Sequence, residues 1–118
     1  MRISEAASRS GLSVDTIRFY EKSGLLPPVG RGADGRRDFS AGVVEWLVLL
    51  ASLRDTGMSM REMRHFAGLY RQGDETVLER RQVLLEHAAH LDRRRADLER
   101  CAGILAVKLR RYAEILGG

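Results

Sequence analysis

Apolar side chains recur at helical spacing along most of the chain, beginning with two short segments near the N-terminus. The pattern predicts a helix over 4–10, ended by Gly11, and a second helix that begins after Ser13. Glycine just beyond a helix adopts positive φ without strain, and a serine oxygen caps a first turn. Two helices joined by a short turn containing glycine have the spacing of a helix-turn-helix, which we place at 3–24.

The second of these helices is expected to bury one face and present the other. The inward positions are Val14, Ile17 and either Phe19 or Leu25, whereas Thr16, Arg18 and Tyr20 are expected to face outward. Phe19 therefore has two open interpretations, which are packing beneath the helix or contact with a partner. An exposed helix face with a cation and an aromatic hydroxyl is suited to DNA.

The segment 26–39 interrupts the helical pattern. Pro27 and Pro28 exclude a helix, and the stretch RGADGRR is rich in turn residues. We expect extended arms at 26–29 and 36–39 around a turn at 33–35. These arms would form a small hairpin, or wing.

Helical spacing returns over 41–72 and predicts a pair of capped helices. Ser40 caps the first, at about 42–55, and Gly57 closes it; Ser59 and Glu62 form a capping box for the second. The first helix has apolar residues at Val43, Trp46, Leu47, Leu50 and Leu53. Trp46 is interpreted as a core residue, with the lining of a small-ligand pocket against a partner's long helix as the alternative.

The remaining residues, 74–118, predict one long helix with an apolar residue at every seventh position. Such a helix cannot bury this stripe within its own chain, so a second copy is the expected partner. We favour an antiparallel coiled coil, although the heptads do not fix the direction. The fold class is thus mainly α, with a winged helix-turn-helix domain at 1–73 and a dimerisation helix at 74–118. The dimerisation residues are Val77, Leu84, Ala88, Leu91, Leu98, Ala102, Leu105, Leu109 and Tyr112.

Charge and composition narrow the range of partners. The net charge is +4 and the pI about 9.8, with most of the excess in the first 73 residues, which suits a polyanion. The single cysteine, Cys101, excludes an intramolecular disulfide and fits a reducing cytosol. No apolar run reaches the roughly 20 residues of a membrane helix, and the N-terminus lacks the pattern of a signal peptide. We therefore expect a cytoplasmic protein with no membrane partner.

Neither catalysis nor metal binding is indicated. His87, His90 and Cys101 contain no local chelating pair, so we predict no metal and no cofactor. No nucleophile–base pair or paired-carboxylate motif stands out, and the glycine-rich RGADG lacks the lysine and helix of a phosphate-binding loop. An enzyme is not expected.

These motifs together resemble the MerR family of bacterial transcriptional regulators. The stretch ISEAASRSGLSVDTIRFYEKSGLLPP is similar to that family's helix-turn-helix, and GRRDFS to its wing. The resemblance implies that Arg18 contacts DNA from the recognition helix, Tyr20 and Arg37 contact phosphate, and Thr16 reads bases. It also implies a homodimer that distorts double-stranded promoter DNA so that RNA polymerase can engage it.

Three departures from the family pattern bear on control. Arg36 stands where the wing usually carries tyrosine, which should strengthen salt-dependent phosphate contact. The segments EWLVLLASLRDTGMSMREM and YRQGDET resemble the aldehyde- and electrophile-stress subgroup, but Ser52 stands where that subgroup has its sensor cysteine. The chain also ends at Gly118, without a cysteine-rich metal loop or a C-terminal drug-binding domain. A small-molecule effector, if the protein has one, is not identified by the sequence.

The predicted function is that of a homodimeric, sequence-specific DNA-binding transcriptional regulator that activates or represses by distorting promoter DNA. The alternatives are a constitutive or architectural DNA-binding protein without a ligand, and a coiled-coil interaction module. Arg54 and Arg61, with the backbone N–H groups near Ser59, are candidates for a second wing, or else for simple surface charge. The predicted DNA-binding residues are Thr16, Arg18, Phe19, Tyr20, Arg36, Arg37, Arg54, Ser59 and Arg61.

Overall fold

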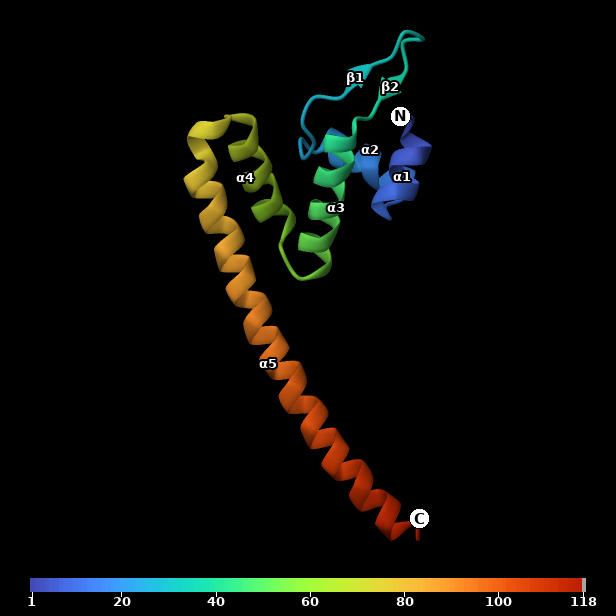
Figure 1. The fold of residues 1–118 in the computed structure, drawn as a ribbon, viewed down its shortest axis with the longest axis vertical. Coiled ribbons are helices and arrows are strands. Elements are labelled where there is room, and N and C mark those ends of the chain that lie inside the picture. The colour runs from blue at the N-terminus through green and yellow to red at the C-terminus, as the bar shows by residue number, and fades with distance from the viewer. Residues whose placement is uncertain (118) are drawn as a thin grey trace. The chain divides into compact units, whose positions relative to one another are not determined.

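The computed structural model describes residues 1–117 and is largely helical (Figure 1). It contains two compact units, which we call the head (residues 1–83) and the tail (from Leu84 onward). In chain order the elements are α1 (Ile3–Ser10), α2 (Val14–Lys22), β1 (Gly30–Arg31), β2 (Arg37–Asp38), α3 (Ala41–Asp55), α4 (Met60–Arg71), a 3-10 turn η1 (Asp74–Thr76) and α5 (Val77–Ile115).

Helices α1 and α2 form the predicted helix-turn-helix. Gly11 ends α1 with φ 77°, and its N–H donates to the carbonyl of Ala7. The Ser13 hydroxyl oxygen accepts the Thr16 N–H at 3.0 Å and so caps α2. Both local predictions are confirmed, because each depends only on residues within one helical turn.

The wing exists, and its second strand lies within the predicted arm at 36–39, but its first strand lies further along the chain than predicted. They are Gly30–Arg31 and Arg37–Asp38, paired antiparallel with Arg31 opposite Arg37. The prediction of an arm at 26–29 was wrong, because Pro27 and Pro28 have no N–H to donate to a ladder. The hairpin therefore closes beyond them, and the turn is made by Gly32 to Gly35, where Gly35 has φ 78°.

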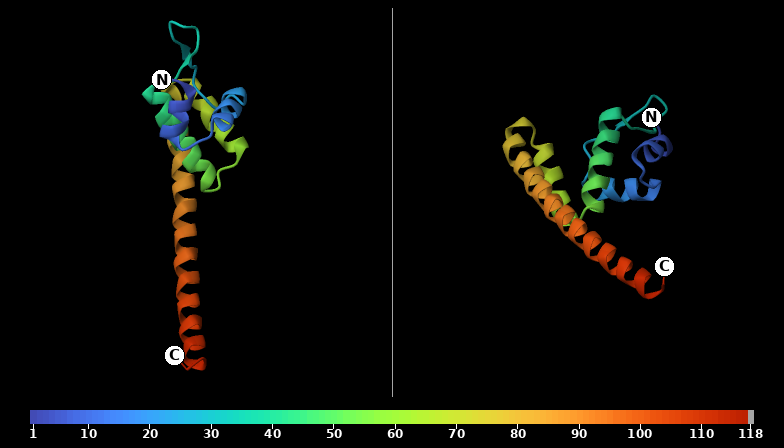
Figure 2. Two further views of the ribbon diagram at one scale, coloured as in Figure 1. Left: turned by 90° about the vertical axis from the view of Figure 1, so that its right-hand side faces the viewer. Right: turned by 60° about the horizontal axis from the view of Figure 1, so that its bottom comes forward.

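Helices α3 and α4 have the predicted caps. Ser40 accepts the Val43 N–H at 3.2 Å, and Ser59 and Glu62 form a reciprocal capping box at the start of α4. Figures 1 and 2 show α3 at the centre of the head, with α1 and α2 on one side and α4 on the other. This central position explains why α3 is apolar on several sides.

One hydrophobic core holds the head together. Trp46 lies within it, stacked on Phe66 with ring centroids 5.4 Å apart, and its indole N–H donates to the Leu25 carbonyl at 2.7 Å. That geometry supports the core interpretation of Trp46. The largest fully buried side chains come from α2, α3 and α4 and from the segments that follow α2 and β2: Ile17, Tyr20, Leu25, Phe39, Leu47, Leu50 and Met63.

The long helix begins slightly later than predicted, because Asp74–Thr76 form the 3-10 turn η1. Buried Thr76 donates to the Leu69 carbonyl at 2.5 Å and accepts from the Arg80 guanidinium at 3.1 Å. Arg80 also donates to the Gly73 carbonyl at 3.0 Å, so the first turn of α5 is fastened to the end of α4. From there α5 continues for 39 residues without a break, as the views in Figure 2 show.

Candidate nucleic-acid interface

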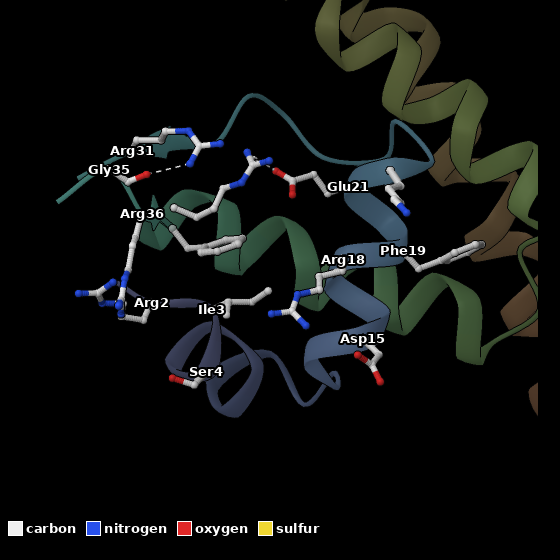
Figure 3. A pocket seen from close by; sticks show the side chains of 13 residues that line it. Arg2, Ile3, Ser4, Asp15, Arg18, Phe19, Glu21, Arg31, Gly35 and Arg36 are labelled. Carbon is white, nitrogen blue, oxygen red and sulfur yellow. Dashed lines mark hydrogen bonds and ion pairs between the residues drawn. The ribbon is translucent and has the colours of Figure 1, made fainter. Parts of the chain in front are cut away.

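A groove runs between α2 and the wing, with a volume of about 960 Å³. Its walls come from the start of α1, from α2 and from both wing strands, and Figure 3 shows the side chains that line it. The cations of the groove are Arg2, Arg18, Lys22, Arg31, Arg36 and Arg37, and the carboxylates are Asp15 and Glu21. The surface is therefore strongly basic.

The cations of this groove fall into two sets. Within residues 1–117, the side chains of Arg18, Lys22 and Arg36 make no hydrogen bond or ion pair, so they are available to a ligand. The other three are engaged: Arg2 with Asp34 at 2.5 Å, Arg31 with the Gly35 carbonyl at 2.8 Å, and Arg37 with Glu21 at 2.8 Å. An exposed and unpaired guanidinium is the group that proteins use most often to contact phosphates and guanine edges.

Arg18 occupies the central position of the groove. It is exposed on α2 and points into the space that the wing borders, whereas Phe19 points away from the wing (Figure 3). Thr16 precedes Arg18 by two residues and is half-exposed. Its hydroxyl accepts a hydrogen bond from the hydroxyl of the cap residue Ser13 at 2.8 Å. The sequence thus placed Arg18 correctly on the outer face.

The structure contradicts the prediction for Tyr20 and decides between the two interpretations of Phe19. Tyr20 is only 2% exposed and belongs to the core, whereas Phe19 is 54% exposed. The expectation that Tyr20 faces outward was wrong, and so was the interpretation that Phe19 packs beneath the helix; Leu25 is the buried residue of that pair. Helical spacing explains the result, because Tyr20 lies three residues after buried Ile17 and shares its face.

Arg54 is tied to the buried Tyr20 rather than to the groove. Its guanidinium donates to the Tyr20 hydroxyl at 3.0 Å and contacts Asp55 at 3.2 Å. Partial burial by itself lowers the pKa of Arg54, but the Asp55 hydrogen bond and the attraction of Tyr20 outweigh it and raise that pKa above its ordinary value. Arg54 remains a cation throughout the physiological range, at the point where α3 meets α2.

Ser59 and Arg61 lie at the turn between α3 and α4, and neither lines the groove. The Ser59 hydroxyl is used in the capping box, where it accepts the Glu62 N–H at 3.1 Å. Arg61 is exposed in the first turn of α4. The structure therefore brings together Arg18, Arg36 and Arg37 in the groove, and leaves Arg54, Ser59 and Arg61 as a separate group.

The predicted DNA-binding residues lack three cations of the groove, Arg2, Lys22 and Arg31, and also Asp34, which supports the wing turn. Arg2 precedes the first helix, and nothing in the local pattern marks it; Lys22 ends α2 and reads as an ordinary helix-terminal cation. Asp34 organises the wing turn by accepting the Arg36 N–H at 3.0 Å. That backbone hydrogen bond, with help from Arg2, holds the pKa of Asp34 below its ordinary value.

The tail shows the apolar stripe that the heptads predicted. No side chain of α5 is buried, and the leucines of the stripe include Leu98 at 67% and Leu105 at 55% exposure. No helix in the described part of the chain is long and apolar enough to cross a membrane. Within the single chain the apolar stripe of α5 is therefore not covered by other side chains.

A recognition helix next to a short wing, with a basic groove between them, defines a winged helix-turn-helix DNA-binding protein. The comparisons give the same class. The chain matches the family model for the MerR HTH family regulatory protein over residues 1–68 and the model for the MerR DNA-binding region over 44–106. The chain belongs to the MerR family and is a sequence-specific DNA-binding transcriptional regulator.

Relatives cover nearly the whole chain. An uncharacterized HTH-type transcriptional regulator of Haemophilus influenzae is 39% identical over 96% of this chain and 85% of its own length. The HTH-type transcriptional regulator AdhR of Bacillus subtilis is 33% identical, over 77% of this chain and 65% of its own length. HiNmlR, a MerR family regulator lacking the sensor domain and solved bound to promoter DNA, superposes with a TM-score of 0.86 at 37% identity, covering 99% of this chain and 94% of that one.

Proposed function

We propose that the protein binds double-stranded promoter DNA as a homodimer and regulates transcription by distorting that DNA. The observation that carries the proposal is the groove, in which the unpaired cations Arg18 and Arg36 stand on two different elements, α2 and the wing. A helix in the major groove and a wing over the backbone would use these two groups together.

Arg18 reads DNA bases in this proposal, and Arg36 contacts phosphate. Thr16 and exposed Phe19 flank Arg18 and supply a polar and an apolar contact, the latter suited to a thymine methyl group. Only the hydroxyl of Tyr20 would contact a phosphate, because the ring is in the core. Arg54, which donates to that hydroxyl, would bring a further cation to the same phosphate. Ser59 and Arg61 would receive a phosphate at the N-terminus of α4.

The dimer is proposed to form through the apolar stripe of α5, with the two helices antiparallel. Two heads would then be held at a fixed separation, and a rigid pair of readers can bend or untwist the DNA between them at an energetic cost that depends on sequence. RNA polymerase would act on the distorted promoter. We place the protein in the cytoplasm, where bacterial promoters are.

Control by a ligand is the open part of this proposal. Ser52 lies exposed on α3 and has no thiolate chemistry, so an electrophile cannot be sensed at that position through a thiol. This favours, as a second candidate, a regulator that acts without a ligand. Thermal-shift measurements with aldehydes, thiol reagents, divalent metals and small organic molecules test it: saturable stabilisation by one compound would exclude it.

The experiment that tests DNA binding compares Arg18→Ala with the wild type on duplexes from the region upstream of the gene. Loss of a bidentate base contact should weaken specific binding about tenfold or more. Arg9→Ala is the matched control, because Arg9 is an exposed arginine on α1 that lies outside the groove and pairs with Glu5. Equal affinity of the Arg18→Ala and Arg9→Ala proteins for the specific duplex would refute the assignment.

A further inference from the structure

Glu21 is a carboxylate on the DNA-facing side of α2, where charge alone would favour a neutral or basic residue. It lines the groove and lies one helical turn after Arg18. A negative charge next to a phosphate backbone weakens binding. We therefore expect Glu21 to make a favourable interaction within the protein that offsets its repulsion of the DNA.

The geometry identifies the partner of Glu21. Its Oε2 lies 2.8 Å from a terminal guanidinium nitrogen of Arg37 on β2, and the Glu21 side chain is only 26% exposed. Figure 3 shows Glu21 extending from α2 toward the wing. Within residues 1–117, this ion pair is the only hydrogen bond or ion pair that joins α2 to the wing strands.

The wing cannot fix its own position against α2. Its strands have two residues each, and a lone two-stranded hairpin is marginal in water. Its other fastenings lead to the N-terminus and the core. The amine of Met1 donates to Asp38 Oδ1 at 2.5 Å and to the Phe39 carbonyl at 2.7 Å, the side chain of Phe39 is buried in the core, and Asp34 pairs with Arg2 at the turn. None of these hydrogen bonds and ion pairs involves a residue of α2.

We infer that Glu21 is a positioning residue, which holds Arg37 so that the wing stands at a fixed distance from α2. Arg18 and Arg36 then meet the base edges and the phosphate backbone in one docking geometry. In this account Arg37 bridges the wing to the helix and does not serve chiefly as a phosphate contact. The inference rests on the groove being the DNA-binding site, as proposed above.

This role separates specific from non-specific binding. Neutralising Glu21 removes a repulsive charge, so the affinity for non-specific DNA should rise or stay constant. The same change also releases the wing from α2. The affinity for the specific duplex, which depends on contacts by Arg18 and Arg36 at the same time, should therefore fall. A residue that merely repels DNA would shift both affinities upward together.

The test measures affinities by fluorescence anisotropy over a series of salt concentrations, with a duplex that the wild-type protein selects from a random pool and a scrambled duplex. For Glu21→Gln we expect the ratio of specific to non-specific affinity to fall about tenfold, with non-specific affinity unchanged or raised. Glu5→Gln is the matched control, because Glu5 pairs with Arg9 on α1 outside the groove and changes the net charge equally. Its ratio should equal that of the wild type.

The reversed pair provides a second, independent readout. Arg37→Glu alone should lose specific binding, and adding Glu21→Arg should restore at least part of it, because the pair is rebuilt with opposite signs. No restoration, or an equal rise of both affinities in Glu21→Gln, would overturn the inference. If Glu21→Gln does not fold, as judged by circular dichroism, the reversed pair decides alone. A wild-type protein that selects no sequence would instead overturn the proposed function itself.

Discussion

The head and the tail differ in where their apolar side chains go. In the head, side chains from α1 to α4 converge on one core, in which Leu25, Leu47 and Leu50 are fully buried. In the tail, leucines such as Leu98 and Leu109 are 67% and 66% exposed. The head therefore buries its apolar side chains within one chain, whereas the tail leaves its apolar surface exposed.

This difference teaches how far one sequence pattern determines structure. Helical spacing is present in both regions, but the head has turns that let short helices fold back on one another. The tail contains Gly103 inside the helix and no proline, so nothing reverses its direction. A single long helix cannot enclose a core, which is the reason for our proposal that a second copy covers the stripe.

The largest expected effect comes from breaking the core of the head. Leu47→Ala removes a fully buried side chain in α3 and should destabilise the head by about 2–5 kcal/mol. Val48 is the next residue, and its side chain is 42% exposed. Val48→Ala should therefore change stability by about 0.5 kcal/mol or less. Urea denaturation monitored by circular dichroism measures both. Equal losses would mean that the core is not organised as described.

The second prediction sharpens the comparison within the tail itself. Leu105 and Val107 are almost equally exposed in the single chain, at 55% and 59%, but only Leu105 lies on the heptad stripe. Leu105→Ala should raise the dimer dissociation constant about tenfold or more, because each dimer loses two interface leucines. Val107→Ala should leave it nearly unchanged.

Sedimentation equilibrium over a range of protein concentrations provides the dissociation constants for these two variants. A larger effect at Val107 than at Leu105 would show that a different face of α5 pairs. A wild-type protein that stays monomeric at every concentration would refute the proposed dimer, while leaving the structure of the head unaffected.

The sequence predicted the local features of the head well. Caps such as Ser13, Ser40 and Ser59 depend on residues within one turn, and all three were placed correctly. The orientation of Tyr20 was missed, although its spacing from Ile17 pointed inward. The guanidinium of Arg54 on α3 donates a hydrogen bond to the phenol oxygen of Tyr20. Only the tertiary fold brings Arg54 to this position, so the local pattern did not reveal the contact.

The groove could be predicted only in part, for the same reason. Arg18 and Arg36 were found because each sits in a recognisable local motif. Arg2 was not, because it comes to the groove through its ion pair with Asp34, which lies 32 residues away. The Glu21–Arg37 pair was also out of reach, since it depends on how the wing folds back over α2.

The third prediction concerns a local feature of the head that needs no core. Ser59→Ala removes the capping box of α4 and should cost about 1 kcal/mol of stability. Ser52→Ala is the matched control, since Ser52 is exposed inside α3 and caps nothing. Thermal and urea unfolding should show a loss for the first variant only. A neutral Ser59→Ala would mean that the box adds nothing beyond solvent contacts.

The smallest expected effect lies in the wing, which is as exposed as the tail but is closed by its own hydrogen bonds. The Arg36 N–H, and to a lesser degree Arg2, lowers the pKa of Asp34 in the folded protein below the ordinary value of 3.8. Because the folded pKa is the lower one, the contribution of Asp34 to the wing is present above the ordinary value and is lost as the pH falls through the folded value.

An NMR titration of the Arg36 amide should therefore show a transition at acidic pH, below the ordinary Asp value, while the head stays folded. In Asp34→Asn this transition should disappear, and the melting temperature of the head should stay nearly constant, because an exposed ion pair contributes little to global stability. A transition at or above the ordinary Asp value would contradict the hydrogen bond. A drop in melting temperature comparable to that of Leu47→Ala would show that the wing turn is packed as part of the core of the head. The wing would then not be an exposed region comparable to the tail.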